Sequence, residues 1–145
     1  MIEVIEGNLL DFSDKVDIIV NAWNRNFIPH RLLYTHGVSK AIKEKAGLKP
    51  FDEVQRRGLL KLGEGVLTSS GHLNCKGIIH VAGINMVWRS SEKAIRLSAQ
   101  SIIKIMIEND FNSAAVPLIG CGASKFNEIS EKEIYIIKYK NKTAK

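Results

Sequence analysis

Short apolar runs along the chain predict five β-strands. The predicted strands are residues 2–6, 16–20, 65–69, 77–82 and 114–119. Residues 2–6 alternate apolar and acidic side chains, which is typical of a half-buried or edge strand. Residues 114–119 are continuously apolar, which is typical of a strand covered on both faces, although Pro117 lacks the N–H that a central strand uses.

Apolar residues at helical spacing, with capping signals at the ends, predict three helices. They span residues 37–46, residues 50–57, and a long segment from Ser90 or Ser91 to about Glu108. Gly47 follows the first helix as a residue suited to the left-handed conformation beyond a helix end. The longest helix has an apolar stripe that we expect to face the core, comprising Ile95, Ala99, Ile102 and Met106.

The segment after residue 130 supports two interpretations. Ser130 and Glu133 fit a capping box, which favours a helix over residues 131–139. Residues 134–139 are rich in strand formers, which favours a strand instead. We expect the helix, and we expect residues 140–145 to form a disordered basic tail.

Predicted strands alternate with helices after the first quarter of the chain. This alternation indicates the α/β class, with helices on both faces of a mixed sheet. The 145 residues suffice for one domain, which we expect over residues 1–139.

The composition indicates the cellular compartment of the protein and excludes some classes of binding partner. The net charge of +6 suits a phosphorylated ligand, but aromatic residues do not interleave with the basic ones, so nucleic-acid binding is not expected. No apolar run is long enough to cross a bilayer, so no membrane partner is expected. Cys75 and Cys121 stand apart without metal-ligand spacing, which predicts a cytoplasmic protein without a disulfide or a metal site.

Two stretches of small residues are candidates for phosphate binding. The last predicted strand runs directly into Gly120, Cys121, Gly122, Ala123 and Ser124. Their backbone N–H groups are open to close approach by an anion, although a tight turn would use the same residues. The helix that begins at Gly37 and Ser39 is similarly open at its first N–H groups. Together they indicate a phosphate site at the carboxyl edge of the sheet.

With these pieces in order, the sequence resembles the macrodomain family of ADP-ribose-binding modules over about residues 2–130. The matching segments are residues 7–9 (GNL), 17–24 (DIIVNAWN), 37–42 (GVSKAI), 63–68 (GEGVLT), 78–83 (IIHVAG) and 116–122 (VPLIGCG). The resemblance implies a three-layer α/β/α sandwich with a mixed, mostly parallel sheet. It also implies ADP-ribose, free or attached to protein, as the ligand, and it implies no cofactor.

The resemblance assigns a part of the ligand to each stretch. Adenine would lie near Asn8 and Leu9, although the family more often has aspartate where Asn8 stands. The diphosphate would lie between Gly37, Val38 and Ser39 on one side and Gly120, Cys121, Gly122, Ala123 and Ser124 on the other. The distal ribose would contact Asn24 and Phe126, and Asn21 would hold the loop by hydrogen bonds. Trp23 replaces a small residue, and it either fills the core or narrows the ribose end of the cleft.

Neither carboxylate arrangement of the macrodomain hydrolases is intact in this sequence. Ser39 stands where one group has aspartate, and the loop at Ser124 offers no carboxylate where another group has one. His36 and Asn24 remain the candidates for positioning a catalytic water. We expect His80 to be a hydrogen-bonded core histidine and Cys121 to be a small loop residue, whereas His30 and His72 carry no signal.

Three functions remain open on the sequence alone. We expect an ADP-ribose-binding module; the alternatives are an ADP-ribosyl hydrolase or O-acetyl-ADP-ribose deacetylase, and a truncated, inactive copy. Family members usually continue into a final strand beyond the predicted last helix. Either residues 134–139 supply that strand through a short crossover, or the sheet lacks it and exposes an edge that would favour oligomers.

Overall fold

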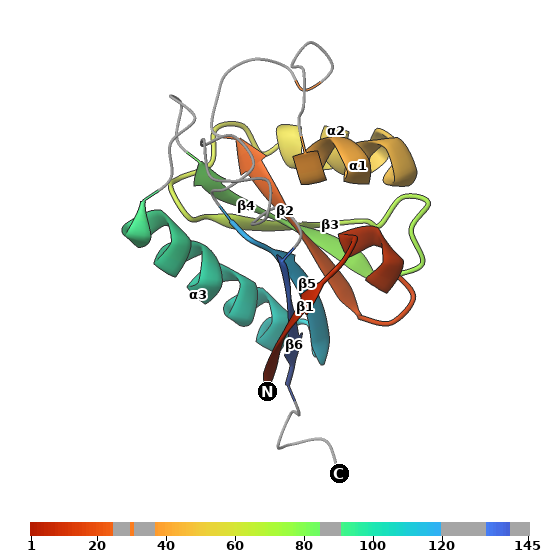
Figure 1. Ribbon diagram of the computed structural model, residues 1–145. Helices are drawn as coiled ribbons and strands as arrows, with labels where there is room; N and C mark the ends of the chain where they lie inside the picture. Colours follow the sequence, from red (N-terminus) through yellow and green to blue (C-terminus); the bar gives the residue numbers. More distant parts are fainter. Residues whose placement is uncertain (25–29, 31–36, 85–90, 120–132, 140–145) are drawn as a thin grey trace.

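A computed structural model describes residues 1–24, 30, 37–84, 91–119 and 133–139 (Figure 1). Within them, six strands form one sheet in the order β1-β6-β5-β2-β4-β3. The strands are β1 (Ile2–Glu6), β2 (Ile18–Asn24), β3 (Gly65–Thr68), β4 (Gly77–Ile84), β5 (Ser113–Pro117) and β6 (Glu133–Lys138). The helices are the 3-10 helix η1 (Leu9–Phe12), α1 (Gly37–Ala46), α2 (Lys49–Gln55) and α3 (Glu92–Glu108). The α/β class expected from the sequence is confirmed.

The sheet is mixed, with its parallel strands at the centre. β2 pairs in parallel with both β4 and β5. The β1–β6, β5–β6 and β3–β4 pairs are antiparallel. It follows that β1, β2, β4 and β5 run in one direction and that β3 and β6 run in the other.

Helices cover both faces of the sheet, as Figure 1 shows for α3 on one side and for α1 and α2 on the other. Residues 18–21 of β2 are buried and contact helices on both faces of the sheet, because successive side chains of a strand point to opposite faces. Ile19 packs in one cluster with Phe51 of α2, whereas Ile18 packs in another with Ile102 of α3. The three-layer architecture is therefore confirmed.

The ends of the helices follow the predicted signals. Ser91, rather than Ser90, is the N-cap of α3, and its hydroxyl oxygen accepts a hydrogen bond from the N–H of Ala94 at 3.1 Å. Gly47 follows α1 with a φ of +86°, in the left-handed region that favours glycine beyond a helix end.

The expected helix over residues 131–139 is wrong for residues 133–138, which form β6. Ile134 and Ile136 are buried on the α1 and α2 side, and β6 pairs with β1 on one side and β5 on the other. The hydrogen bonds of β6 to two neighbouring strands stabilise the strand more than the local capping signal stabilises a helix. Because β5 and β6 are antiparallel, the chain returns without the expected short crossover, and the sheet does not lack this strand.

The prediction of which α3 residues face the core is confirmed for two of the four residues. Ile102 and Met106 are buried as expected, but Ile95 is 44% exposed. The buried row contains Ala94 and Ser98 in place of Ile95 and Ala99. Ser98 is tolerated there because its hydroxyl donates a hydrogen bond to the carbonyl oxygen of Ala94 at 2.7 Å.

Candidate functional site

The centre of the sheet has the topology that creates a ligand crevice. The chain passes from β2 to β4 by way of α1, α2 and β3, and then from β4 back across β2 to β5 by way of α3. The two connections run in opposite directions and use opposite faces of the sheet. Open α/β sheets bind ligands at such a reversal, beyond the carboxyl ends of the strands. β2 and β5 are parallel neighbours, with Ile18 opposite Ala114 and Ile19 opposite Ala115, so both strands run toward this edge.

Asn21 and His80 form a buried polar pair beneath this edge. Both are 0% exposed, and Nδ2 of Asn21 lies 3.0 Å from Nδ1 of His80. Nε2 of His80 lies 2.9 Å from the hydroxyl of Thr68, which donates to the carbonyl oxygen of Ser69 at 3.0 Å. The Asn21 amide donates to Nδ1, so the imidazole proton is on Nε2. Burial lowers the pKa of His80 to about 3, so the ring is neutral at pH 7.

This pair confirms the expectation for His80, whereas the expectation that Asn21 holds the loop by hydrogen bonds stays a prediction. His80 is a hydrogen-bonded core histidine, as predicted. Asn21 uses its amide nitrogen inside the core, and its Oδ1 has no hydrogen-bond partner within the part of the chain that the structure describes. A buried amide oxygen without a partner leaves one acceptor available at the end of β2.

Trp23 fills the core between β2 and α2. Its ring centroid lies 6.0 Å from that of Phe51 and 5.9 Å from that of His80, with an edge-on contact to His80. The pairing of β2 with β4 shifts register between Ala22 and Asn24, so Trp23 occupies an irregular position. Such irregularities bend the strand and redirect the residues that follow. Asn24 follows directly and is the last residue of β2.

The start of α1 suits an anion. Gly37 is its first residue, and its first turn contains no acidic side chain, whereas Lys43 and Lys45 lie in its last turn. The partial positive charge of the N-terminus is therefore not neutralised within the helix. Val38 and Ser39 are both half-buried, and Val38 packs against the core cluster that contains Phe51. The contacts available to a ligand here are thus those of the backbone and of Ser39.

Asn8 and Leu9 lie at the start of η1, after β1. The Asn8 side chain is exposed, and its Oδ1 accepts a hydrogen bond from the N–H of Leu10 at 3.0 Å. An amide oxygen has two lone pairs, so it can accept a second hydrogen bond. Leu9 is only 5% exposed and belongs to the core, which leaves its backbone as the group open to a ligand.

Other predicted site residues lie outside the described residues. These are His36, Gly120, Cys121, Gly122, Ala123, Ser124 and Phe126. The chain leads into the glycine loop through Leu118 and Ile119, and Ile119 is buried against the cluster on the α3 side. Gly83 of β4 makes room for it, because a Cβ at this position would overlap the side chain of Ile119. The base of the loop is therefore fixed by packing.

His30 is a residue that carried no signal in the sequence. It is 2% exposed, and its Nε2 lies 2.6 Å from Oδ1 of Asp52. No local motif predicts this contact, because the two residues are separated by 22 positions.

The profile of the family described as "Macro domain" matches residues 20–132. The chain belongs to this family. Two curated relatives are each 30% identical to this macrodomain. The O-acetyl-ADP-ribose deacetylase of Salmonella gallinarum aligns over 143 residues, which cover 93% of this chain and 75% of that protein. The human protein mono-ADP-ribosyltransferase PARP14 aligns over 85% of this chain, which spans only 6% of that protein's length.

A solved structure extends the similarity to the fold. The crystal structure of a Trypanosoma brucei macrodomain in complex with ADP-ribose superimposes with a TM-score of 0.66 and 26% sequence identity. The superposition covers 81% of this chain and 46% of that one.

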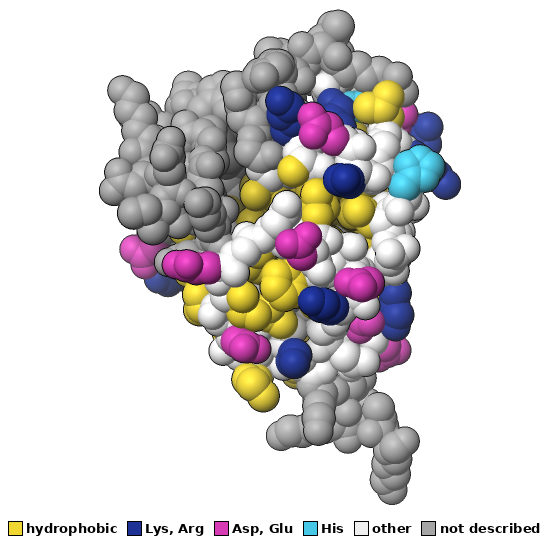
Figure 2. All heavy atoms as spheres, turned by 45° about the vertical axis from the view of Figure 1, so that its right-hand side comes forward, with side chains coloured by type: hydrophobic (Ala, Val, Ile, Leu, Met, Phe, Trp, Pro, Cys, Tyr) yellow, Lys and Arg dark blue, Asp and Glu magenta, His cyan; other side chains and the backbone are white. Residues whose placement is uncertain are grey.

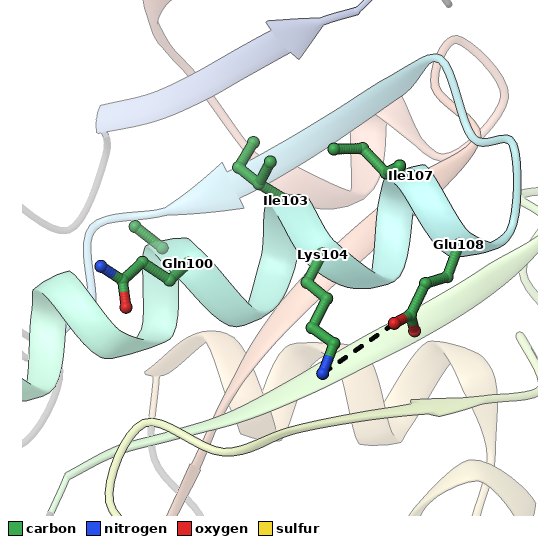
Figure 3. Close-up of a pocket in the computed structure, with 6 residues that line it drawn as sticks. Gln100, Ile103, Lys104, Ile107 and Glu108 are labelled. Carbon is green, nitrogen blue, oxygen red and sulfur yellow. Dashed lines mark ion pairs between the residues drawn. The ribbon is translucent and has the colours of Figure 1, made fainter.

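The macrodomain also has a hollow of about 620 Å³ on α3, and none of the predicted site residues that the structure describes lines it. Its lining residues are Ala99, Gln100, Ile103, Lys104, Ile107 and Glu108. Figure 3 shows Ile103 and Ile107 pointing away from the ion pair of Lys104 and Glu108, whose Nζ and Oε1 are 3.9 Å apart. The cation of this lining, Lys104, is paired with Glu108, and the rest of the lining apart from Gln100 is apolar, so the sheet edge is the better candidate for a diphosphate.

We also searched the described residues for a basic surface patch, a membrane-spanning helix and a cluster of metal ligands. On the face drawn in Figure 2, acidic and basic side chains of the described residues are interspersed and do not gather into one basic patch. Among the described helices, none has the length and hydropathy to span a bilayer. Within the same residues, no group of three or more His, Cys, Asp or Glu side chains comes together as metal ligands.

Proposed function

We propose that this macrodomain binds ADP-ribose at the carboxyl edge of its sheet. The observation that carries the proposal is the parallel pairing of β2 with β5 at the topological reversal, with α1 beginning at Gly37 on the β2 side. The diphosphate would lie between the α1 start, at Gly37, Val38 and Ser39, and the loop of residues 120–124. The T. brucei macrodomain, solved with ADP-ribose, supports this choice of ligand.

The remaining parts of the ligand follow from this placement. Adenine would lie at Asn8, whose exposed amide oxygen can accept from the adenine amino group. The distal ribose would contact Asn24, with Phe126 against it. Free ADP-ribose and ADP-ribose attached to a protein present the same diphosphate and adenosine, so both are candidate ligands.

Deacetylation or ADP-ribosyl hydrolysis is the second candidate, favoured by the similarity to the Salmonella O-acetyl-ADP-ribose deacetylase. In that case Asn24 and His36 would position the attacking water beside the ligand's own phosphate. The described start of α1 has Ser39 and no carboxylate, so binding is the better supported function. Incubation with O-acetyl-ADP-ribose, with the acetate released measured in the wild type and in His36→Ala, tests this candidate.

Titration calorimetry with ADP-ribose tests the binding function. We expect one site per chain in the wild type. Ala123→Glu places a bulky anion in the loop and should weaken binding by at least tenfold. Ala99→Glu makes the same change on exposed α3 and should leave binding unaltered. An absence of heat with the wild type, at concentrations that saturate other macrodomains, would contradict the proposal.

A further inference from the structure

Strand β1 forms one end of the sheet, and no described segment pairs with its outer side. Figure 1 shows it beside β6, at the N-terminal end of the chain. Four of its five residues are exposed, and Ile2 and Val4 are 67% and 58% exposed. The strand at the other end, β3, has two buried residues among its four and contacts both α2 and α3. β1 is therefore the accessible edge of the sheet.

The hydrogen bonds between β1 and β6 show which backbone groups of β1 point outward. Met1 and Lys138 exchange hydrogen bonds between their backbone nitrogens and oxygens, both at 3.0 Å. Such pairs alternate along an antiparallel ladder, so Glu3 and Ile5 bind β6 in the same way. The residues between them direct their N–H and C=O groups away from β6; these are Ile2, Val4 and Glu6.

The side chains of Ile2 and Val4 lie on the α3 side of the sheet. Their register partners on β6 are Ile137 and Tyr135. Both partners pack against the core cluster that includes Ile102 of α3, and register partners point to the same face. Two exposed aliphatic side chains thus stand beside the outward backbone groups, where an added strand would cover them.

The carboxylates of β1 indicate the charge of a fitting partner. Glu3 and Glu6 are both exposed, and alternation places them on opposite faces of the strand. Neither forms an ion pair within the part of the chain that the structure describes. A second copy that paired through β1 would add its own two carboxylates to the same short interface. A basic strand would instead place cations opposite both carboxylates, which stabilises cross-strand pairs.

We propose that the outer edge of β1 binds an extended segment of another protein, made of apolar and basic residues, as an added strand. Ile2, Val4 and Glu6 supply the backbone hydrogen bonds. Apolar residues of the segment pack on Ile2 and Val4, and its basic residues lie opposite Glu3 and Glu6. The ladder to β6 already holds β1 extended, so little ordering of this edge is needed on binding. The surface includes none of the residues proposed to bind ADP-ribose, so the inference stands apart from the proposed function.

The probe is a synthetic peptide with the central sequence KTVKV and one threonine on each side. In an antiparallel register its lysines lie opposite Glu6 and Glu3, and its valines lie opposite Val4 and Ile2. The peptide with the central sequence ETVEV differs only in the sign of its charges. Two N-methylated forms of KTVKV test the strand pairing. Methylation at the first valine removes an N–H that donates to Val4, whereas methylation at the second lysine alters an N–H that points away from β1.

Fluorescence anisotropy of the labelled peptides gives their dissociation constants, and backbone amide NMR signals of the protein locate the contact. We expect KTVKV to bind about fivefold or more tightly than ETVEV, because two opposite-charge pairs replace two like-charge pairs. Its saturable shifts should fall on residues 2–6. Methylation at the first valine should weaken binding by about fivefold or more, and methylation at the second lysine should change it by less than about twofold.

Charge reversal on the protein tests the same contact from the other side. The double variant Glu3→Lys with Glu6→Lys should prefer ETVEV over KTVKV. Glu92→Lys with Glu108→Lys is the matched control, since both carboxylates are exposed on α3 and the net charge changes by the same amount. It should keep the preference of the wild type, which separates the local carboxylates from the overall charge. Circular dichroism establishes that each variant is folded.

Three results would overturn the inference. The first is a folded wild type that binds neither peptide, or that binds both with equal affinity. The second is an equal effect of the two methylations, which would exclude pairing as an added strand. The third is a dimer in sedimentation velocity whose amide shifts on dilution fall on residues 2–6, which would assign this edge to a second copy of the chain.

Discussion

The side chains of Asn21 and His80 meet across β2 and β4, with Nδ2 of the amide 3.0 Å from Nδ1 of the imidazole. The two residues are register partners in a parallel ladder, so the sheet itself brings them together. The neutral ring accepts from Asn21 and donates to Thr68, and this places a polar network directly below the proposed ligand edge.

We expect the free energy of unfolding to fall in acid because of His80. Its pKa falls from 6.5 to about 3 on burial, so between these values the unfolded chain binds one more proton at this site than the folded chain. The stabilisation is complete above pH 6.5 and is lost as the pH falls toward 3. Urea unfolding at pH 7, 5 and 4 should show a free energy that falls more steeply in the wild type than in His80→Gln. The difference should approach about 1.4 kcal/mol per pH unit. Equal slopes would show that His80 is not buried as a neutral ring.

Glu53 should contribute a second acid-sensitive element. Its carboxylate accepts from both the N–H and the hydroxyl of Ser69, at 2.9 and 2.6 Å, and these hydrogen bonds hold its pKa below 4.5. Their stabilisation is present above pH 4.5 and is lost as the pH falls below it. Glu53→Gln should therefore be less stable than the wild type at pH 7, with the gap narrowing as the pH falls below 4.5. A gap that persists in acid would place the effect in packing.

Substitution of Asn8 by aspartate should tighten adenine binding. Aspartate still caps η1 by accepting from Leu10, and its charge strengthens the hydrogen bond with the adenine amino group. A gain of about 1 kcal/mol corresponds to roughly fivefold in the dissociation constant of ADP-ribose. The inosine analogue, which lacks the amino group, is the control and should not gain. Equal gains for both ligands would remove Asn8 from base recognition.

Two adjacent isoleucines of α3 should differ in their effect on stability. Ile102 is 2% exposed under the sheet, and its replacement by alanine should cost about 2–5 kcal/mol. Ile103 is 39% exposed at the hollow, and the same substitution should cost less than about 1 kcal/mol. Chemical denaturation of the two variants checks the orientation of α3. Comparable losses would show that the Ile103 face is covered.

The sequence predicted the helices and strands that are marked by a capping residue or by an apolar run. Gly47 and Ser91 ended or capped helices where glycine and serine do so in general, and the apolar runs of β2 and β5 became central strands. Pro117 fits because it is the last residue of β5, beyond the positions that pair with β2.

The sequence predictions and the structure differ where contacts between distant parts of the chain determine the conformation. Residues 133–138 carry both helix and strand signals, and the two neighbouring ladders select the strand. The face of α3 that is buried depends on where the sheet lies, and the row through Ala94 and Ser98 is no more apolar than the row through Ile95. His30 could not be singled out, because its partners on α1 and α2 follow from folding and not from any local spacing.

The binding position is tested most directly by the backbone amide NMR signals of the labelled protein during titration with ADP-ribose. We expect the largest shifts on residues 37–39 and 120–124, with smaller ones at Asn8. Residues 99–108 of α3, around the apolar hollow, should not shift. Saturable shifts confined to α3, or none at either phosphate-binding stretch, would contradict the account.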